Sequence, residues 1–395
     1  MNLQKFFRRV TPILFAGTIF FASTTANAEI QNYTGQGSYI MSEGENLAVA
    51  KERAKADAMR NACEQAGTFV ESTTQVANMM VTKDEIITMT GGIVKLLEEP
   101  TYESKMMENL EGMLVSVTVK VSIDSEDVLK WLKKSSGERA QLVKQMEALQ
   151  KSNDEQSRQI AELKQQLAQA QSESERQQIA KGFATEEDKF MSNQKVSEAW
   201  DLEADDDING ALNLFDEAVK LNPNNALAWY GRATMHNDLK QYEQSLQDFN
   251  KAIELNPNDS YAYNNRGIAH KNLGQYEQAI QDYNKAVQLD PNDADAYYNR
   301  GNSYNDLKQY DRAIQDYDKA LELNPDYVNA YFNRGAAYKS LEDYESAVED
   351  FTDYIELEPD DADAYKMRGE CYEQLGDNDA AQNDFDKAEE LADAD

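Results

Sequence analysis

The chain has 395 residues, with 72 acidic and 39 basic side chains and a formal net charge of −33. A chain this acidic repels nucleic acid and anionic membrane surfaces, so we expect neither as a partner. It has only two histidines and two cysteines and lacks a glycine-rich phosphate loop, a serine elbow and a zinc pattern, so we predict neither an enzyme nor a cofactor.

Residues 1–28 have the composition of a signal peptide. A basic start is followed by an apolar run over 10–23 and by Ala26-Asn27-Ala28, a small-x-small cleavage site. Cleavage before Glu29 would remove three basic residues and no acidic ones, which takes the net charge to −36. We therefore predict export to the periplasm, with no membrane span after cleavage. An uncleaved membrane anchor is the alternative.

Residues 29–133 predict a small α+β domain. The alternation of apolar and polar residues predicts strands at Tyr33–Met41 and Val115–Ile123. An alanine-rich helix is expected over Asn46–Ala66, ended by Gly67 and followed by a β-rich run over Thr68–Val76. A further helical stretch is expected around Asp84–Leu97.

The alanine-rich segment also carries a resemblance. Residues 54–62, together with Ala66-Gly67, Ser72-Thr73 and Val76, are similar to a module in the N-terminal domains of flagellar ring assembly proteins and in small envelope lipoproteins. The resemblance implies an accessory or assembly role at the cell envelope, without catalysis.

A glutamine-rich segment over 138–181 predicts a central coiled-coil helix. Apolar residues alternate at spacings of four and three and form a heptad seam. The a positions are Met146, Asn153, Ile160 and Leu167, and the d positions are Leu142, Leu149, Gln156, Leu163 and Ala170. Asn153 at an a position favours a parallel homodimer, Gln156 leaves a trimer open, and a single solvated helix is the alternative.

The C-terminal half has a period of 34 residues, marked by Pro223, Pro257, Pro291, Pro325 and Pro359. Each period repeats small and aromatic residues in phase, as in Tyr263, Gly267, Ala279 and Tyr283, which predicts two antiparallel helices in close contact. This pattern resembles the tetratricopeptide repeat (TPR) family, which implies an α-solenoid. The predicted units are 192–225, which is degenerate, 226–259, 260–293, 294–327, 328–361 and 362–395.

An arginine precedes an aspartate by sixteen residues in five successive units. In the degenerate unit both members are replaced together, by Glu198 and Leu214. Because arginine binds a carboxylate through two parallel bonds, we predict a structural ladder of Arg–Asp pairs. A phosphate-binding role for the arginines is the alternative. Three of the pairs are Arg266–Asp282, Arg300–Asp316 and Arg334–Asp350.

The segment Asp205–Asp216 matches a calcium loop in its spacing of oxygen-bearing residues. Asp205, Asp207, Asn209 and Asp216 stand at ligand positions, with Gly210 at the turn. The repeat frame instead places Asn209 onward in a helix, so we interpret the segment as an acidic turn between helices and predict no metal. Calcium binding is the alternative.

The concave face of the predicted solenoid is the candidate partner site. Its asparagine row could bind the backbone of an extended peptide, because an amide both donates and accepts hydrogen bonds; mere tolerance of asparagine at this helix position is the alternative. The predicted partner-binding residues are Asn265, Asn299, Asn333, Tyr298, Phe332, Asn302 and Lys339. The carboxylate clamp of chaperone-binding TPR proteins is missing from this row.

We therefore expect a periplasmic TPR scaffold that binds a segment of another envelope protein. The layout of a signal, a coiled coil and repeats also resembles the cell-division coordinator of the Tol–Pal system, which is a second hypothesis. A calcium-dependent binding module centred on Asp205–Asp216 is the third.

Overall fold

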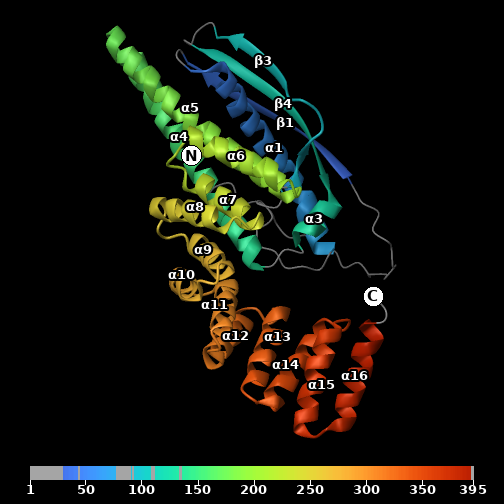
Figure 1. Ribbon diagram of the computed structural model, residues 1–395. Helices are drawn as coiled ribbons and strands as arrows, with labels where there is room; N and C mark the ends of the chain where they lie inside the picture. The colour runs from blue at the N-terminus through green and yellow to red at the C-terminus, as the bar shows by residue number, and fades with distance from the viewer. Residues whose placement is uncertain are drawn as a thin grey trace, which may run out of the picture.

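The structure is a computed structural model that describes residues 30–42, 45–76, 90, 93–107, 112–132 and 136–392. A small N-terminal α+β domain packs beside a long helical hairpin, and an array of helix pairs extends from the hairpin to the C-terminus (Figure 1). None of the described helices combines the length and the apolar character that a membrane crossing needs. The predicted signal peptide lies outside the described residues.

The N-terminal domain is an antiparallel sheet covered by one long helix. The central strand β4 (Met113–Asp124) pairs with β1 (Ile30–Met41) on one side and with β2 (Lys95–Leu96) and β3 (Thr101–Met106) on the other. The core consists of alternate residues of β4, from Val115 to Ile123, packed against alanines of α1 (Leu47–Val76). A Cβ atom on Gly35 would lie 2.0 Å from the carbonyl oxygen of Ala58, so glycine permits this close packing. The short helix α3 (Ser125–Leu132) follows β4.

Two expectations for this domain were wrong. Gly67 does not end α1, and the predicted β-rich run over Thr68–Val76 is helical. The buried row of α1 repeats every four residues from Ala50 to Val70, so packing on the sheet continues the helix past the glycine. The helix predicted around Asp84–Leu97 falls mostly outside the described residues, and its end at Lys95–Leu96 is the strand β2.

The predicted continuous coiled-coil helix was also wrong. The helix α4 (Ser136–Gln169) ends before a turn at 170–172, and α5 (Glu173–Ala204) runs back along it. Ser172 and Glu175 form a capping box that begins α5. The seam residues Leu149, Gln156 and Ile160 are buried within the chain, and Asn153 pairs with Asn193 of α5. The predicted homodimer stays untested, but its seam residues already have partners inside one chain.

The helix pairs of the array follow the 34-residue frame. The degenerate unit combines the end of α5 with α6 (Ile208–Leu221). The next two units are α7 (Ala226–Asp238) with α8 (Tyr242–Leu255), and α9 (Ser260–Asn272) with α10 (Tyr276–Leu289). The last three are α11 (Ala294–Asp306) with α12 (Tyr310–Leu323), α13 (Val328–Ser340) with α14 (Tyr344–Leu357), and α15 (Ala362–Leu375) with α16 (Asn378–Ala392).

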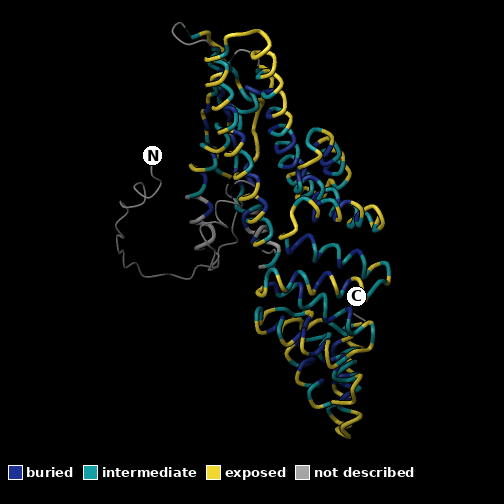
Figure 2. The backbone as a smooth tube through the Cα atoms, turned by 90° about the vertical axis from the view of Figure 1, so that its left-hand side faces the viewer, coloured by how far each residue is buried: buried dark blue, intermediate teal, exposed yellow. Residues whose placement is uncertain are grey.

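Small residues allow the two helices of each pair to approach, and aromatic rings fill the space between them. A Cβ atom on Gly267 would lie 2.6 Å from the ring of Tyr283, which is fully buried. The second helices before α16 all end two residues before the proline, as α8 does at Leu255, ahead of Pro257. Figure 2 shows the buried positions in the interior of the array and exposed turns at its margins. The predicted mainly α fold, with a C-terminal helix-repeat solenoid and a small N-terminal α+β domain, is confirmed.

Candidate functional site

The first helices of the repeats form the concave face of the array. Each of α7, α9, α11 and α13 contacts the next first helix directly, in addition to its own second helix. The second helices lie farther apart and contact mainly first helices. We use the term concave face for the surface of α7, α9, α11, α13 and α15.

The structure forms every predicted Arg–Asp pair, in one repeated geometry. Nε and Nη2 of each arginine donate to the two carboxylate oxygens at 2.5–2.9 Å. The five pairs are Arg232–Asp248, Arg266–Asp282, Arg300–Asp316, Arg334–Asp350 and Arg368–Asp384. The aspartates are buried, so this is a structural ladder rather than an open anion site.

The ladder also joins each repeat to the preceding one. Nη1 of Arg300 donates to Asn284 in the second helix of the preceding repeat at 2.7 Å. Nη1 of each of the other four arginines donates to the residue at the equivalent position, which is an asparagine, an aspartate or a threonine. Each guanidinium also lies over the ring three residues earlier, as Arg300 does over Tyr297 at 5.4 Å. Burial raises the pKa of Asp316, and the Arg300 guanidinium opposes that rise. The arginines therefore fix the position of each repeat relative to the preceding one.

The predicted asparagine row bridges successive repeats. Nδ2 of Asn265 donates to the Tyr230 hydroxyl at 2.6 Å, and Nδ2 of Asn299 donates to Oδ1 of Asn264 at 3.2 Å. Nδ2 of Asn333 donates to the Tyr298 hydroxyl and to Oδ1 of Asn302, both at 2.9 Å. Each of the three amides thus donates at least one hydrogen bond within the array, and peptide binding by this row stays a prediction.

The other predicted groove residues are also largely in contact with the array. Phe332 packs against Phe351 and Tyr354. Tyr298 packs against Tyr317 and Tyr327. Lys339 pairs with Glu370 across to α15. The structure brings the predicted residues to one face, but it uses most of their polar atoms for contacts between repeats.

The first part of the concave face is covered by the chain itself. Nε2 of Gln141, near the start of α4, donates to the Tyr230 hydroxyl at 2.7 Å. Lys144 pairs with Asp290 at 2.9 Å and lies over the Tyr261 ring at 4.7 Å. In the described residues, no element outside the array packs extensively on α13 or α15. The C-terminal part of the face is therefore open as far as the described residues go.

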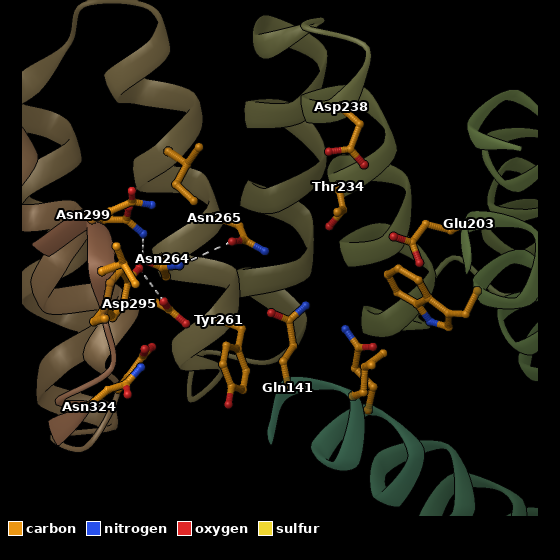
Figure 3. Close-up of a pocket in the computed structure, with 18 of the residues that line it drawn as sticks. Gln141, Glu203, Thr234, Asp238, Tyr261, Asn264, Asn265, Asp295, Asn299 and Asn324 are labelled. Carbon is orange, nitrogen blue, oxygen red and sulfur yellow. Dashed lines mark hydrogen bonds between the residues drawn. The ribbon is translucent and has the colours of Figure 1, made fainter. Parts of the chain in front are cut away.

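A cavity of about 650 Å³ lies where α4 meets the concave face. Figure 3 shows Gln141, Thr234, Asp238, Tyr261, Asn264, Asn265, Asp295 and Asn299 around it, with Glu203 of α5 and Asn324 completing the wall. Asp293, Asp326 and Tyr327 also line it. This volume is within the range of ligand pockets in proteins.

Two buried polar side chains of this cavity have atoms with no hydrogen-bond partner among the described residues. Gln145 is 7% exposed, and both of its amide atoms are unpaired. Asp293 is 8% exposed; its Oδ1 accepts from the backbone of Ala296, whereas its Oδ2 is unpaired. Burial, with the nearby Asp295 and Asp290 carboxylates, raises the pKa of Asp293 to about 6. Unpaired buried polar groups are costly, so these atoms mark a place where a ligand would find partners.

The acidic segment Asp205–Asp216 has the predicted turn-and-helix structure. Asp207 caps α6 by accepting from the backbone of Gly210 at 2.9 Å, and Asn209 lies within the helix. Asp216 accepts a bond from Arg232 at 2.7 Å. The described residues contain no cluster of His, Cys, Asp and Glu arranged to hold a metal ion. The helix occupies the stretch that a calcium loop would need in an extended form.

The histidines and cysteines lie apart from the cavity. His236 and His270 occupy equivalent positions, each bonded through Nδ1 to a glutamine of its own turn. Cys63 and Cys371 are both free thiols, and burial raises the pKa of each to about 11. Neither is therefore an ionised nucleophile at neutral pH.

Gln145, Asp293 and Trp200 all line the cavity, but the sequence did not single them out as site residues. Asp293 has the pattern of a helix cap, and Gln145 lies between seam positions of the expected coiled coil. The capping box at Ser172 and Glu175 was the one local signal that α4 ends and turns back.

Comparison with known proteins places the array in a family. Tetratricopeptide repeat models match residues 226–259, 294–327 and 328–361, which are three of the predicted units, and also 249–281 and 351–383. A related TPR model matches 271–308. Residues 226–383 of the array therefore consist of tetratricopeptide repeats. These TPR matches begin at the start of α7 and end within α16, and they leave the N-terminal domain, the hairpin and α6 outside them.

Several solved structures resemble the TPR array. A MamA crystal structure is 25% identical, covers 41% of this chain and 94% of its own, and has a TM-score of 0.39. YrrB, described as a TPR protein with an unusual peptide-binding site, is 24% identical, with coverages of 42% and 85% and a TM-score of 0.37. PilF of Pseudomonas aeruginosa is 17% identical, with coverages of 49% and 88% and a TM-score of 0.45. No curated protein sequence matches the chain.

Proposed function

We propose that this protein is an exported scaffold whose TPR array binds a peptide or protein partner along the open part of its concave face. The observation that carries the proposal is the surface of α13 and α15, which none of the described elements outside the array covers, next to a cavity with unpaired polar atoms. TPR solenoids present extended concave surfaces of this kind for binding. The function is binding rather than catalysis.

The proposed location is the periplasm, and the proposed role is support of envelope assembly. The basic, apolar and small-residue pattern of residues 1–28 supports export. The resemblance of the alanine-rich segment to envelope modules supports the role. The partner in this proposal is another envelope protein, and the N-terminal domain and hairpin position the array toward it.

Site-specific photo-crosslinking tests the binding face. Lys366 on α15 and Gln315 on α12 are both exposed, so a photoreactive residue at either position should leave the fold intact. We expect the mature protein with the group at Lys366 to form one discrete adduct in envelope extract. The group at Gln315 is the matched control and should give none. Adducts from Gln315 alone, or equal adducts from both, would contradict a concave binding face.

A further inference from the structure

The cavity between α4 and the TPR array has a strongly acidic wall. Five carboxylates line it: Glu203, Asp238, Asp293, Asp295 and Asp326. The described residues of its lining include no lysine, arginine or histidine. Lys144, at the nearby edge, is already paired with Asp290. Carboxylates gathered in a partly enclosed space attract a cation, because each raises the cost of ionising the others.

The unpaired atoms of the cavity include hydrogen-bond donors and acceptors, so a ligand that pairs with all of them must carry both. Oδ2 of Asp293 needs a donor, and the Gln145 amide needs one donor and one acceptor. Nε1 of Trp200, which also lines the cavity, is a buried donor without an acceptor. A cation alone can satisfy the carboxylate but offers nothing to the indole and amide N–H groups.

We propose that this cavity binds an arginine or lysine side chain of the partner together with the adjacent peptide backbone. The guanidinium or ammonium group would bind Asp293, and a backbone carbonyl would accept from Gln145 or Trp200. Tyr261 and Tyr327 also line the cavity, and aromatic rings favour a nearby cation. The inference rests on the proposed function and adds that the partner segment is basic.

The chain itself supplies an example of this recognition at the edge of the cavity. Nζ of Lys144 lies over the Tyr261 ring and bonds to Asp290. A lysine on a helix is thus held by an aromatic face and a repeat carboxylate next to the proposed site. A basic side chain of a bound peptide would make the same kind of contact deeper in the cavity, with the Asp293 carboxylate.

The test uses a labelled, short alanine-rich peptide with two arginines, and fluorescence anisotropy with the full mature chain at physiological salt. The same peptide with glutamines in place of the arginines measures background. Asp293→Asn keeps the helix cap, since Asn225 fills the equivalent position of another repeat. We expect Asp293→Asn to weaken arginine-peptide binding about tenfold, the loss of one charge-assisted bond.

Asp361→Asn is the matched control. Asp361 caps α15 at the equivalent position of a later repeat and does not line the cavity. It removes the same charge, so we expect it to leave the peptide affinity unchanged. Equal weakening by both substitutions would mean that the overall negative charge attracts the peptide, and would overturn the site.

Gln145→Leu separates binding from folding. Replacing an unpaired buried amide with an apolar side chain of similar size should raise the melting temperature by a few degrees. The same change should weaken peptide binding several-fold, since it removes a donor and an acceptor. A more stable variant with unchanged affinity would overturn the role of Gln145 in the site.

The outcomes also separate this inference from the proposed function. If arginine amide and spermidine bind as tightly as the peptide, the site takes free cations and the assignment to a peptide is wrong. If a partner cross-links from Lys366 while the arginine peptide binds no better than its glutamine counterpart, the cation site is wrong and the binding face stands.

Discussion

Asp293 is a carboxylate whose ionisation the fold opposes. Burial raises its pKa to about 6, and the nearby carboxylates act in the same direction. In the unfolded chain an aspartate ionises near pH ~3.9. Between these values the folded state keeps a proton that the unfolded state has released. The contribution of Asp293 to stability is therefore full below about pH 4 and falls as the pH rises through about 6.

Asp293→Asn should remove the loss of stability that ionisation of Asp293 causes as the pH rises. We expect the free energy of unfolding at neutral pH to rise by roughly 1–3 kcal/mol, because the asparagine cap carries no charge to bury. Urea unfolding at about pH 4 and about pH 7 should show the gain at neutral pH only. A gain of equal size at both pH values would contradict the raised pKa.

The Arg–Asp ladder predicts a strong dependence of each partner on the other. Arg300→Met leaves the buried Asp316 carboxylate without its guanidinium and should cost about 3–5 kcal/mol. Adding Asp316→Leu should restore most of this loss, because no charge is then left unpaired. Urea unfolding of the single and double variants measures the coupling. Additive losses would show that the pair is a weak surface contact.

At the scale of elements, the turn inside each repeat has one residue in the left-handed region. It is Gly274 at φ +72° and Gly376 at φ +81°, but Lys240, Lys308 and Glu342 occupy the same position with φ of 57–63°. A side chain in this region costs free energy that glycine avoids. The repeat frame tolerates the strain because packing fixes the two helices on either side.

Lys308→Gly should therefore stabilise the protein by up to about 1 kcal/mol. Gly274→Lys is the reverse change at the equivalent position of the preceding repeat and should destabilise by a similar amount. Thermal unfolding of both variants checks the sign. A destabilised Lys308→Gly would mean that the lysine side chain makes a contact worth more than the strain.

The repeats could be predicted from the sequence because each unit carries its own local signals. The proline after each second helix except α16, the glycine at the close approach and the paired arginine and aspartate all recur at the same spacing. Each structural contact that they predicted lies within one repeat or between adjacent repeats, so the period alone located it.

Elements whose structure depends on distant contacts were predicted less well. Among the described residues, nothing outside the adjoining backbone lies within 4 Å of where a Cβ on Gly67 would be, and α1 continues because Val70 is buried against the sheet. The predicted heptad residues do form one apolar face of α4, but this face packs against α5 of the same chain. The cavity needs that return of the chain, so the sequence could not indicate it.

The hairpin makes a prediction about the oligomeric state of the whole molecule. Asn153 Oδ1 accepts from Nδ2 of Asn193 at 2.9 Å within one chain. Asn153→Leu should therefore lower stability by about 1 kcal/mol through the lost hydrogen bond, without changing the mass in light scattering. A change of oligomeric state in this variant would instead support the seam as a contact between chains.

At the scale of the whole molecule, the N-terminal domain, hairpin and array form one connected arrangement. Lys164 of α4 pairs with Glu45 and donates to the backbone of Ile40, and Glu187 of α5 accepts from the backbone of Asn46. The other end of α4 contacts Tyr230 and Asp290 of the array. The hairpin thus connects the two domains, covers the first part of the concave face and leaves the last part open.

Hydrogen exchange of the protein with its captured partner tests the central claim most directly. Backbone amides exchange more slowly where a bound partner stabilises the helices that it contacts. We predict added protection in α11, α13 and α15, with α12, α14 and α16 less affected. Protection confined to the second helices, or to the N-terminal domain alone, would contradict a partner site on the concave face.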